Sequence, residues 1–305
     1  MTKKEINWPD ISKTFARKEL PESEVEFIGE IPGRVVALYK DEALAHIASE
    51  LELPGFRKGH VPADIALKKV GEIAALEESV EMLMRDLYPA LITEHATDAV
   101  GRPDIRITKL ASGQPVGLTV RTAVYPTVMI PNNWKDIASK IPLEPYTGEL
   151  PKTEPPPSPE EEQKARDYMA RDIRRGKIID ALLEKTQVAV PKIFVESELD
   201  KIMSQMREDV ARFGMTFEIY LKQINKSEDA IRNEFKDQAT KRAKLQLVLN
   251  KLAADEKIDA DKNVVDKEMK HAVEHFPKAN QELLRIHIET VLRNEKALKI
   301  LEGKT

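Results

Sequence analysis

Short apolar runs alternate with turn signals in the first part of the chain. Residues 24–31 alternate apolar and polar side chains, a proline–glycine pair follows, and residues 34–39 resume the alternation, which predicts a β-hairpin. Residues 105–109 and 118–124 alternate in the same way. Because one side of each run is apolar, we expect all four segments to join one antiparallel sheet that covers a core.

Three helices are expected between these strands. Residues 41–51, 62–75 and 77–95 contain apolar side chains three or four positions apart, the spacing of one helix face. In the third segment this stripe consists of Val80, Leu83, Leu87 and Leu91. Pro89 lies inside the segment and is expected to kink the helix, because proline lacks the backbone N–H. Strands and helices together predict an α+β fold with helices on one face of the sheet.

The second part of the chain is helical throughout. Ser158, Pro159 and Glu161 form a typical helix start, in which the serine caps the helix and the glutamate returns a hydrogen bond. Further helices are expected to begin near Pro191, Thr216, Ser227, Asp261 and Asn280. Gly214 is expected to end the helix that begins near Pro191. No fixed-period repeat is visible, so the pattern favours an elongated all-α domain over a regular solenoid.

A proline-rich stretch separates the two parts. Seven prolines fall between Pro142 and Pro159, amid acidic residues and few large apolar ones. Such a sequence is typical of an extended linker. The chain is therefore divided into an N-terminal extension (1–22), an α+β domain (23–140), a linker (141–163) and a helical domain (164–305).

Composition excludes several classes of chemistry. The 305 residues contain no cysteine, which rules out disulfides, cysteine-ligated metals and a thiol nucleophile. The net charge of −4 does not favour a plain RNA-binding module. The N-terminal residues lack the apolar core of a signal peptide, and no stretch is long and apolar enough to span a membrane. We expect a cytoplasmic protein with no membrane partner.

The loop at residues 53–62 is the most distinctive motif of the chain. Gly55 and Gly59 bracket Phe56, Arg57 and Lys58 between two predicted helices. An aromatic side chain at such a tip, next to two cations, suits docking onto a partner that offers apolar surface and carboxylates or phosphates. The alternative is an ordinary polar turn in which the aromatic ring folds inward.

Several methionines lie on the predicted helices of the second part. Met is flexible and polarisable and suits surfaces that accept many partner sequences. Methionines at helical spacing are more often core residues, so both interpretations stay open. The residues predicted to bind polypeptide are Met203, Met206, Phe213 and Met215.

No residue is nominated for catalysis, and no metal or cofactor is expected. His271 and His275 lie one helical turn apart, but their spacing lacks the His-Glu-x-x-His order of a zinc protease and a third ligand. The carboxylates are spread among lysines and arginines, as on solvated helices.

These motifs resemble those of the bacterial trigger factors. Residues 55–62, Gly-Phe-Arg-Lys-Gly-His-Val-Pro, are similar to the ribosome-docking signature of that family, and residues 188–214 are similar to its helical domain. The resemblance covers about residues 23–135 and 160–301. It implies an ATP-independent chaperone that docks through Gly55, Phe56, Arg57, Lys58 and Gly59 on the large ribosomal subunit, near the exit tunnel, and holds nascent polypeptides in a helical cradle.

The chain also departs from that family. Trigger factors usually carry a prolyl isomerase domain of the FK506-binding type between the docking and helical domains, whereas here only residues 141–163 fill that place. We therefore expect no enzyme activity. His60 stands where a second lysine is common, which lowers the positive charge of the loop. A ribosome-independent holdase or assembly chaperone, residual isomerase activity and a homodimer off the ribosome remain alternatives.

Overall fold

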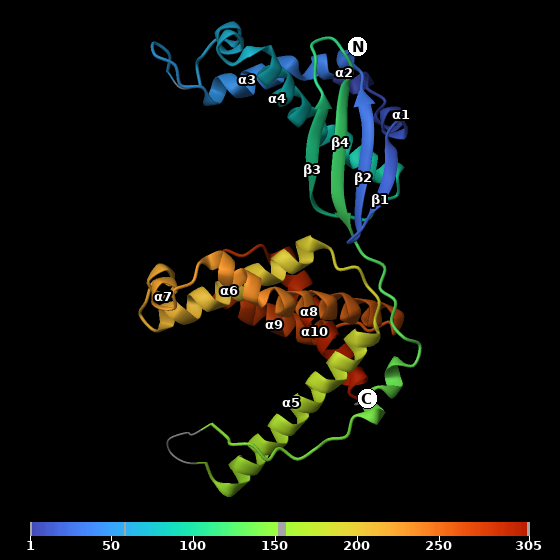
Figure 1. The fold of residues 1–305 in the computed structure, drawn as a ribbon, viewed down its shortest axis with the longest axis vertical. Coiled ribbons are helices and arrows are strands. Elements are labelled where there is room, and N and C mark those ends of the chain that lie inside the picture. Colours follow the sequence, from blue (N-terminus) through green and yellow to red (C-terminus); the bar gives the residue numbers. More distant parts are fainter. Residues whose placement is uncertain (1, 58, 152–156, 304–305) are drawn as a thin grey trace. The chain divides into compact units, whose positions relative to one another are not determined.

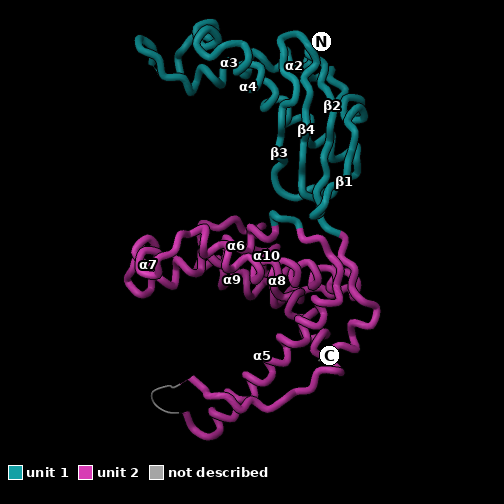
Figure 2. The backbone as a smooth tube through the Cα atoms, in the orientation of Figure 1, with its two compact units in different colours: residues 1–126, 191–193 teal, residues 127–190, 194–305 magenta. Residues whose placement is uncertain are grey.

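The computed structural model describes residues 2–57, 59–151 and 157–303, and the chain forms two compact units (Figures 1 and 2). Unit 1 comprises residues 1–126 with 191–193, and unit 2 comprises residues 127–190 with 194–305. The predicted division into an α+β part and a helical part is confirmed, with the helical region beginning at Pro159. The unit boundary follows Pro126, so the segment 127–163 belongs to the helical unit.

Unit 1 is a four-stranded antiparallel sheet with helices. Its elements, in chain order, are η1 (Lys3–Glu5), α1 (Trp8–Lys13), β1 (Ala16–Leu20), β2 (Glu24–Ile31), α2 (Gly33–Val36), η2 (Ala37–Tyr39), α3 (Lys40–Glu50), α4 (Ala63–Glu94), β3 (Ala99–Lys109) and β4 (Val116–Val124). The strand order is β1-β2-β4-β3. Phe27 of β2 is paired with Val120 of β4, which is paired with Ile105 of β3.

The core of unit 1 lies between the sheet and α4. Phe27, Leu118 and Val120 are fully buried on the sheet, and the predicted stripe of α4 is buried against them. The helix therefore covers the sheet with the face that its apolar spacing defines. On the opposite face of the sheet, Lys18, Glu26, Arg121 and Asp104 form one row of paired positions with alternating charge. Such a row suits a solvated sheet face.

The hairpin predicted from residues 34–39 is wrong. These residues form α2 and η2, and the strand that pairs with β2 on this side is β1. Because β1 and β4 occupy both edges of β2, no edge is available for residues 34–39. The expected N-terminal extension therefore supplies a strand of the sheet. Phe15, only 2% exposed, packs directly over Gly29 of β2.

The expected kink at Pro89 is also wrong. The backbone of α4 leaves the helical conformation at Gly71, with φ 86° and ψ 164°, and not at Pro89. Glycine adopts this conformation without the steric cost that a Cβ atom would impose. Pro89 is exposed, so water can satisfy the carbonyl that loses its partner there.

Unit 2 is built from helices. Its elements are η3 (Trp134–Asp136), η4 (Ala138–Lys140), α5 (Pro159–Lys185), α6 (Lys192–Arg212), α7 (Phe217–Gln223), α8 (Glu228–Asp255), α9 (Lys262–His275) and α10 (Gln281–Leu301). The predicted helix starts are confirmed, because the side chains of Ser158, Thr216, Ser227, Asp261 and Asn280 each accept a backbone hydrogen bond as caps. Gly214 follows the end of α6 with φ 74°.

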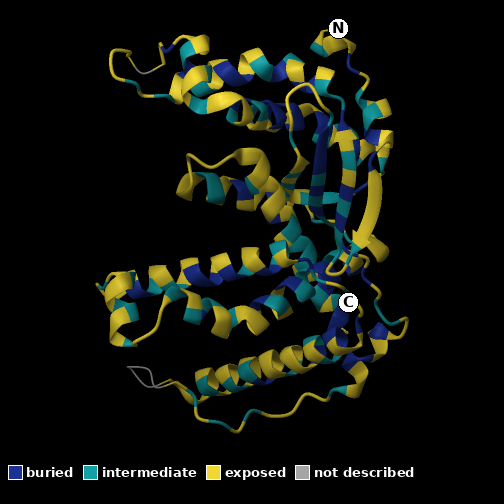
Figure 3. Cartoon of the chain, turned by 45° about the horizontal axis from the view of Figure 1, so that its top comes forward, coloured by how far each residue is buried: buried dark blue, intermediate teal, exposed yellow. Residues whose placement is uncertain are grey.

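The apolar residues of unit 2 fall into three separate clusters. One joins α5, α8 and the residues around Trp134, a second joins α6 to α8, and a third joins α9 to α10. Small separate cores leave much of each helix uncovered, and exposed residues run along all the long helices (Figure 3). Most of the large apolar side chains that stay exposed within the described residues lie in this unit.

The described part of the proline-rich segment runs back along α5 (Figure 1). The Nη1 atom of Arg166 donates to the carbonyls of Tyr146 and Gly148, at 3.3 and 3.1 Å. Lys177 Nζ lies 2.7 Å from a carboxylate oxygen of Glu144. The described part of the segment therefore contacts α5, the helix that follows it.

Arg174 of α5 joins three parts of unit 2. Its guanidinium donates to the carbonyls of Ala138 at 2.7 Å, Ile141 at 2.8 Å and Glu302 at 3.4 Å. We expect Arg174→Ala to lower the free energy of unfolding of unit 2 by about 2 kcal/mol, because a charged donor to several backbone acceptors is lost. Urea unfolding measures this change. Arg171→Ala, at an exposed position of the same helix, is the control and should cost no more than about 0.5 kcal/mol.

Candidate functional site

The signature loop connects α3 to α4 in unit 1. Two turns shape it: the N–H of Phe56 donates to the carbonyl of Leu53 at 3.1 Å, and the N–H of His60 donates to that of Arg57 at 3.0 Å. Gly55 and Gly59 have φ angles of 89° and 81°. A side chain at either glycine would be strained in this left-handed region, so the tip depends on both.

A small core of its own supports the loop. Three residues are buried together: Ala48 of α3, Val61 just before α4, and Ala66 of α4. Leu51 and Leu53 pack against them. Phe56 lies outside every buried cluster of the described residues and is 39% exposed, so its ring is not folded inward. Arg57 and His60 are exposed as well, whereas Lys58 lies outside the described residues. The described part of the loop thus presents an aromatic ring and the guanidinium of Arg57 on a preformed turn.

A groove of about 390 Å³ in unit 2 brings together three of the four residues predicted to bind polypeptide. Met206 comes from α6, and Phe213 and Met215 come from the turn that follows this helix. Phe213 is 82% exposed. The remaining lining residues are Ile202, Gln205, Asp209, Val210, Tyr220, Phe235, Gln238 and Arg242. A groove lined by both apolar and polar side chains is a surface that can bind apolar side chains.

Met203 does not belong to this groove. Its side chain is 0% exposed, so it cannot contact a partner at the surface. Met203 is buried in the interior of the unit, as are Leu199 and Val210 of the same helix. The alternative that methionines at helical spacing are core residues is therefore correct for Met203. Met203 is buried and Met206 is partly exposed, a difference that helical spacing alone does not predict.

Tyr220 and Phe235 line the groove, although sequence reasoning did not select them. Tyr220 comes from α7 and Phe235 from α8, and ion pairs join α8 to α6. Arg232 of α8 contacts Asp200 at 2.8 Å and Glu196 at 2.7 Å on α6. The hydrogen bonds to Asp200 and then to Glu196 raise the pKa of Arg232. Only this helix packing brings the two aromatic residues to the groove.

The described residues contain no group of three His, Asp or Glu side chains arranged to hold a metal ion. His271 and His275 both lie on α9 and are exposed. No helix among the described residues has the length and apolar character needed to cross a bilayer. The described residues thus offer an exposed loop that carries an aromatic ring and a groove lined largely by apolar side chains. Exposed apolar surfaces of this kind are typical of the class of proteins that bind other macromolecules.

Two models of one family match almost the whole chain. The model described as "Bacterial trigger factor protein (TF)" matches residues 14–149, and the one described as "Bacterial trigger factor protein (TF) C-terminus" matches residues 160–302. The chain belongs to the trigger factor family of chaperones. The first match begins at residue 14, which agrees with β1 being part of the domain. Only residues 150–159 lie between the two matches, too few for a folded isomerase domain.

Individual relatives share part of this sequence. The trigger factor of Streptococcus agalactiae is 31% identical over 101 residues, which are 33% of this chain and 23% of that protein. The trigger factor of Rhodococcus opacus is 30% identical over 115 residues, 38% of this chain and 25% of that protein. The chain thus spans about a quarter of the length of the curated relatives it matches.

A solved structure shares the fold. It is described as "Promiscuous Substrate Recognition in Folding and Assembly Activities of the Trigger Factor Chaperone". The alignment covers 95% of this chain and 99% of that one, with a TM-score of 0.55 and 15% sequence identity.

Proposed function

We propose that this protein is an ATP-independent chaperone of the cytoplasm that docks on the large ribosomal subunit and shields nascent polypeptides. The observation that carries the proposal is the exposed signature loop, with Phe56 and Arg57 on a turn that Gly55 and Gly59 shape. An aromatic ring and adjacent cations fit a partner that combines apolar contact with carboxylates or phosphates. The direct test is an alanine variant of the loop, in which replacement of Phe56, Arg57 and Lys58 should abolish co-sedimentation with ribosomes.

The groove of unit 2 supplies the second half of the proposal. Apolar segments of an unfolded chain would be buried reversibly between Met206, Phe213 and Met215, so that no bond is made or broken. Methionine and phenylalanine side chains accept many client sequences, because their contacts depend on apolar area rather than on a fixed hydrogen-bond pattern. Such a groove needs no nucleotide, since binding and release follow from weak contacts.

We expect the variant Met206→Ala, Phe213→Ala, Met215→Ala to suppress aggregation of an unfolded model client about tenfold less effectively than the unmodified chain. Three truncations remove apolar contact area that stabilises a bound segment. Light scattering of a diluted, denatured client measures the effect. The fold should be retained, because Phe213 is 82% exposed and the other two side chains are also partly accessible.

The matched control is Phe276→Ala, which removes a 64% exposed aromatic side chain of the same unit outside the groove. It should leave the suppression of aggregation unchanged. Equal loss in both variants would mean that exposed apolar surface in general, and not the groove, binds the client. Ribosome co-sedimentation of the groove variant should also be unchanged, since the docking loop is intact.

A further inference from the structure

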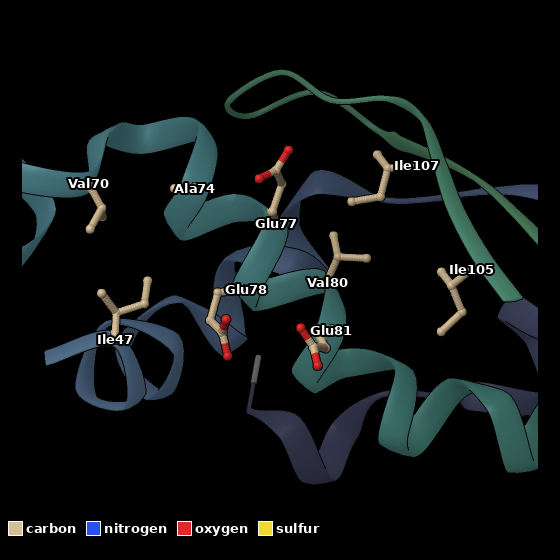
Figure 4. A pocket seen from close by; sticks show the side chains of 9 residues that line it. All are labelled: Ile47, Val70, Ala74, Glu77, Glu78, Val80, Glu81, Ile105 and Ile107. Atoms are coloured by element: carbon tan, nitrogen blue, oxygen red, sulfur yellow. The ribbon is translucent and has the colours of Figure 1, made fainter. Parts of the chain in front are cut away.

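Unit 1 contains a second groove, of about 570 Å³, which neither docking nor the unit 2 groove uses (Figure 4). It lies between α3, α4 and β3. Its lining residues are Ile47, Val70, Ala74, Glu77, Glu78, Val80, Glu81, Ile105 and Ile107. Six apolar side chains thus surround three carboxylates.

The apolar residues of this groove form two patches. Figure 4 shows Ile47, Val70 and Ala74 on one side and Ile105 and Ile107 on the other, with Glu77 and Glu78 between them. The patches stay open for structural reasons. β3 is the edge strand of the sheet, so its inward side chains are only half covered. On the other side, the chain leaves the helical conformation at Gly71, next to Val70.

The charge of the groove is negative. None of its lining residues is a lysine or arginine. Glu78 pairs with His46, whose Nδ1 lies 2.9 Å from the carboxylate, whereas Glu77 and Glu81 are exposed. Two nearby lysines face other partners: Lys40 pairs with Glu72 at 3.6 Å, and Lys109 pairs with Glu30 at 3.2 Å. Lys68 and Lys69, just before Val70, are exposed and do not line the groove. Exposed carboxylates beside apolar surface attract a Lys or Arg side chain that is flanked by apolar side chains, because the charge and the apolar groups both find a partner.

We propose that this groove binds a polypeptide segment that presents, on one face, a Lys or Arg between two apolar side chains. The basic side chain would pair with Glu77 and Glu81, and each apolar side chain would occupy one patch. A helix meets this pattern when the three residues lie at successive turns of one face. An acidic segment or a nucleic acid is disfavoured, because its negative charge would face three carboxylates. The site is independent of the docking loop and of the unit 2 groove.

Two synthetic helical peptides test the proposal with the full chain. One carries Leu, Lys and Leu at successive turns of one face, and the other is identical except that Glu replaces this Lys. Fluorescence anisotropy measures their binding. We expect the Lys peptide to bind at least tenfold more tightly than the Glu peptide, and this preference to weaken as the salt concentration rises.

Charge reversal of the groove provides the decisive comparison. Glu77→Lys with Glu81→Lys should reverse the preference, so that the Glu peptide binds more tightly. The control, Glu19→Lys with Glu94→Lys, makes the same change of net charge at exposed positions of unit 1 outside the groove and should keep the original preference. Equal binding of the two peptides to the unmodified chain, or an unchanged preference after charge reversal, overturns the proposal.

The unit 2 groove variant separates this site from the proposed function. If the Lys peptide loses binding in the Met206→Ala, Phe213→Ala, Met215→Ala variant and not after charge reversal, it occupies unit 2 and the proposal is wrong. Ribosome co-sedimentation involves the loop and not Glu77 or Glu81. A failure of docking therefore leaves the outcome of the peptide experiment unaffected.

Discussion

Replacing Phe56, Arg57 and Lys58 with alanine is expected to abolish co-sedimentation with ribosomes, with a loss of affinity of about a hundredfold or more. Phe56 is exposed on a turn whose shape does not depend on its ring, and Arg57 makes no ion pair within the described residues. The side chains of Phe56 and Arg57 are therefore available for a partner, and the triple replacement deletes apolar contact and charge-assisted hydrogen bonds together. Sedimentation through a sucrose cushion, followed by quantification of the pellet, measures the change.

The loop variant should fold normally. The loop is supported by Ala48, Val61 and Ala66, and neither Phe56 nor Arg57 belongs to this cluster. Circular dichroism and thermal unfolding check that point. A control variant, Phe276→Ala with Lys278→Ala, removes an exposed aromatic ring and a nearby lysine from unit 2 and should sediment like the unmodified chain. Unaltered sedimentation of the loop variant would show that docking does not depend on this loop.

The same variant separates the remaining alternatives. A ribosome-independent holdase would lose nothing, so the loop variant would protect clients in cells as well as the unmodified chain does. The ribosome-docking proposal requires that protection of nascent chains falls while suppression of aggregation by the isolated protein is kept. Residual isomerase activity is a separate matter, and a proline-peptide assay should find isomerisation no faster than the uncatalysed reaction.

Phe15→Ala is expected to lower the free energy of unfolding of unit 1 by about 3–5 kcal/mol, the usual cost of truncating a buried phenylalanine. Phe15 is 2% exposed and belongs to the main core of unit 1. Its ring lies so close to Gly29 that a Cβ atom there would be 2.6 Å from the ring. Truncation would leave a cavity over β2, since this part of the sheet has no other side chain to fill the space. Chemical unfolding followed by circular dichroism measures the loss.

Ile28→Ala is the matched control for Phe15→Ala. Ile28 lies on β2 next to Gly29, but its side chain points to the opposite face and is 45% exposed. Its truncation should cost no more than about 1 kcal/mol. If residues 1–22 were a dispensable extension, Phe15→Ala would be as mild as Ile28→Ala. The large cost is expected because residues 16–20 form β1 and Phe15, just before this strand, belongs to the main core of unit 1.

The sequence by itself determined the features that depend on neighbouring residues. Ser158 and Asn280 cap their helices because a side chain reaches only the backbone N–H groups of the next turn. The buried stripe of α4 follows from spacing along one helix. The loop geometry was also predictable, since Gly55 and Gly59 supply conformations that other residues avoid.

Only the tertiary structure decided which segments pair and which apolar residues remain exposed. Residues 34–39 have an alternating pattern, yet β2 already pairs with β1 and β4, so they form helical turns. Met203 and Met206 have the same chemistry and lie on one helix, and packing buries the first while the second lines a groove with Tyr220 and Phe235. The physical reason is that caps and helix periods depend on local contacts, whereas strand partners and grooves depend on residues distant in the chain.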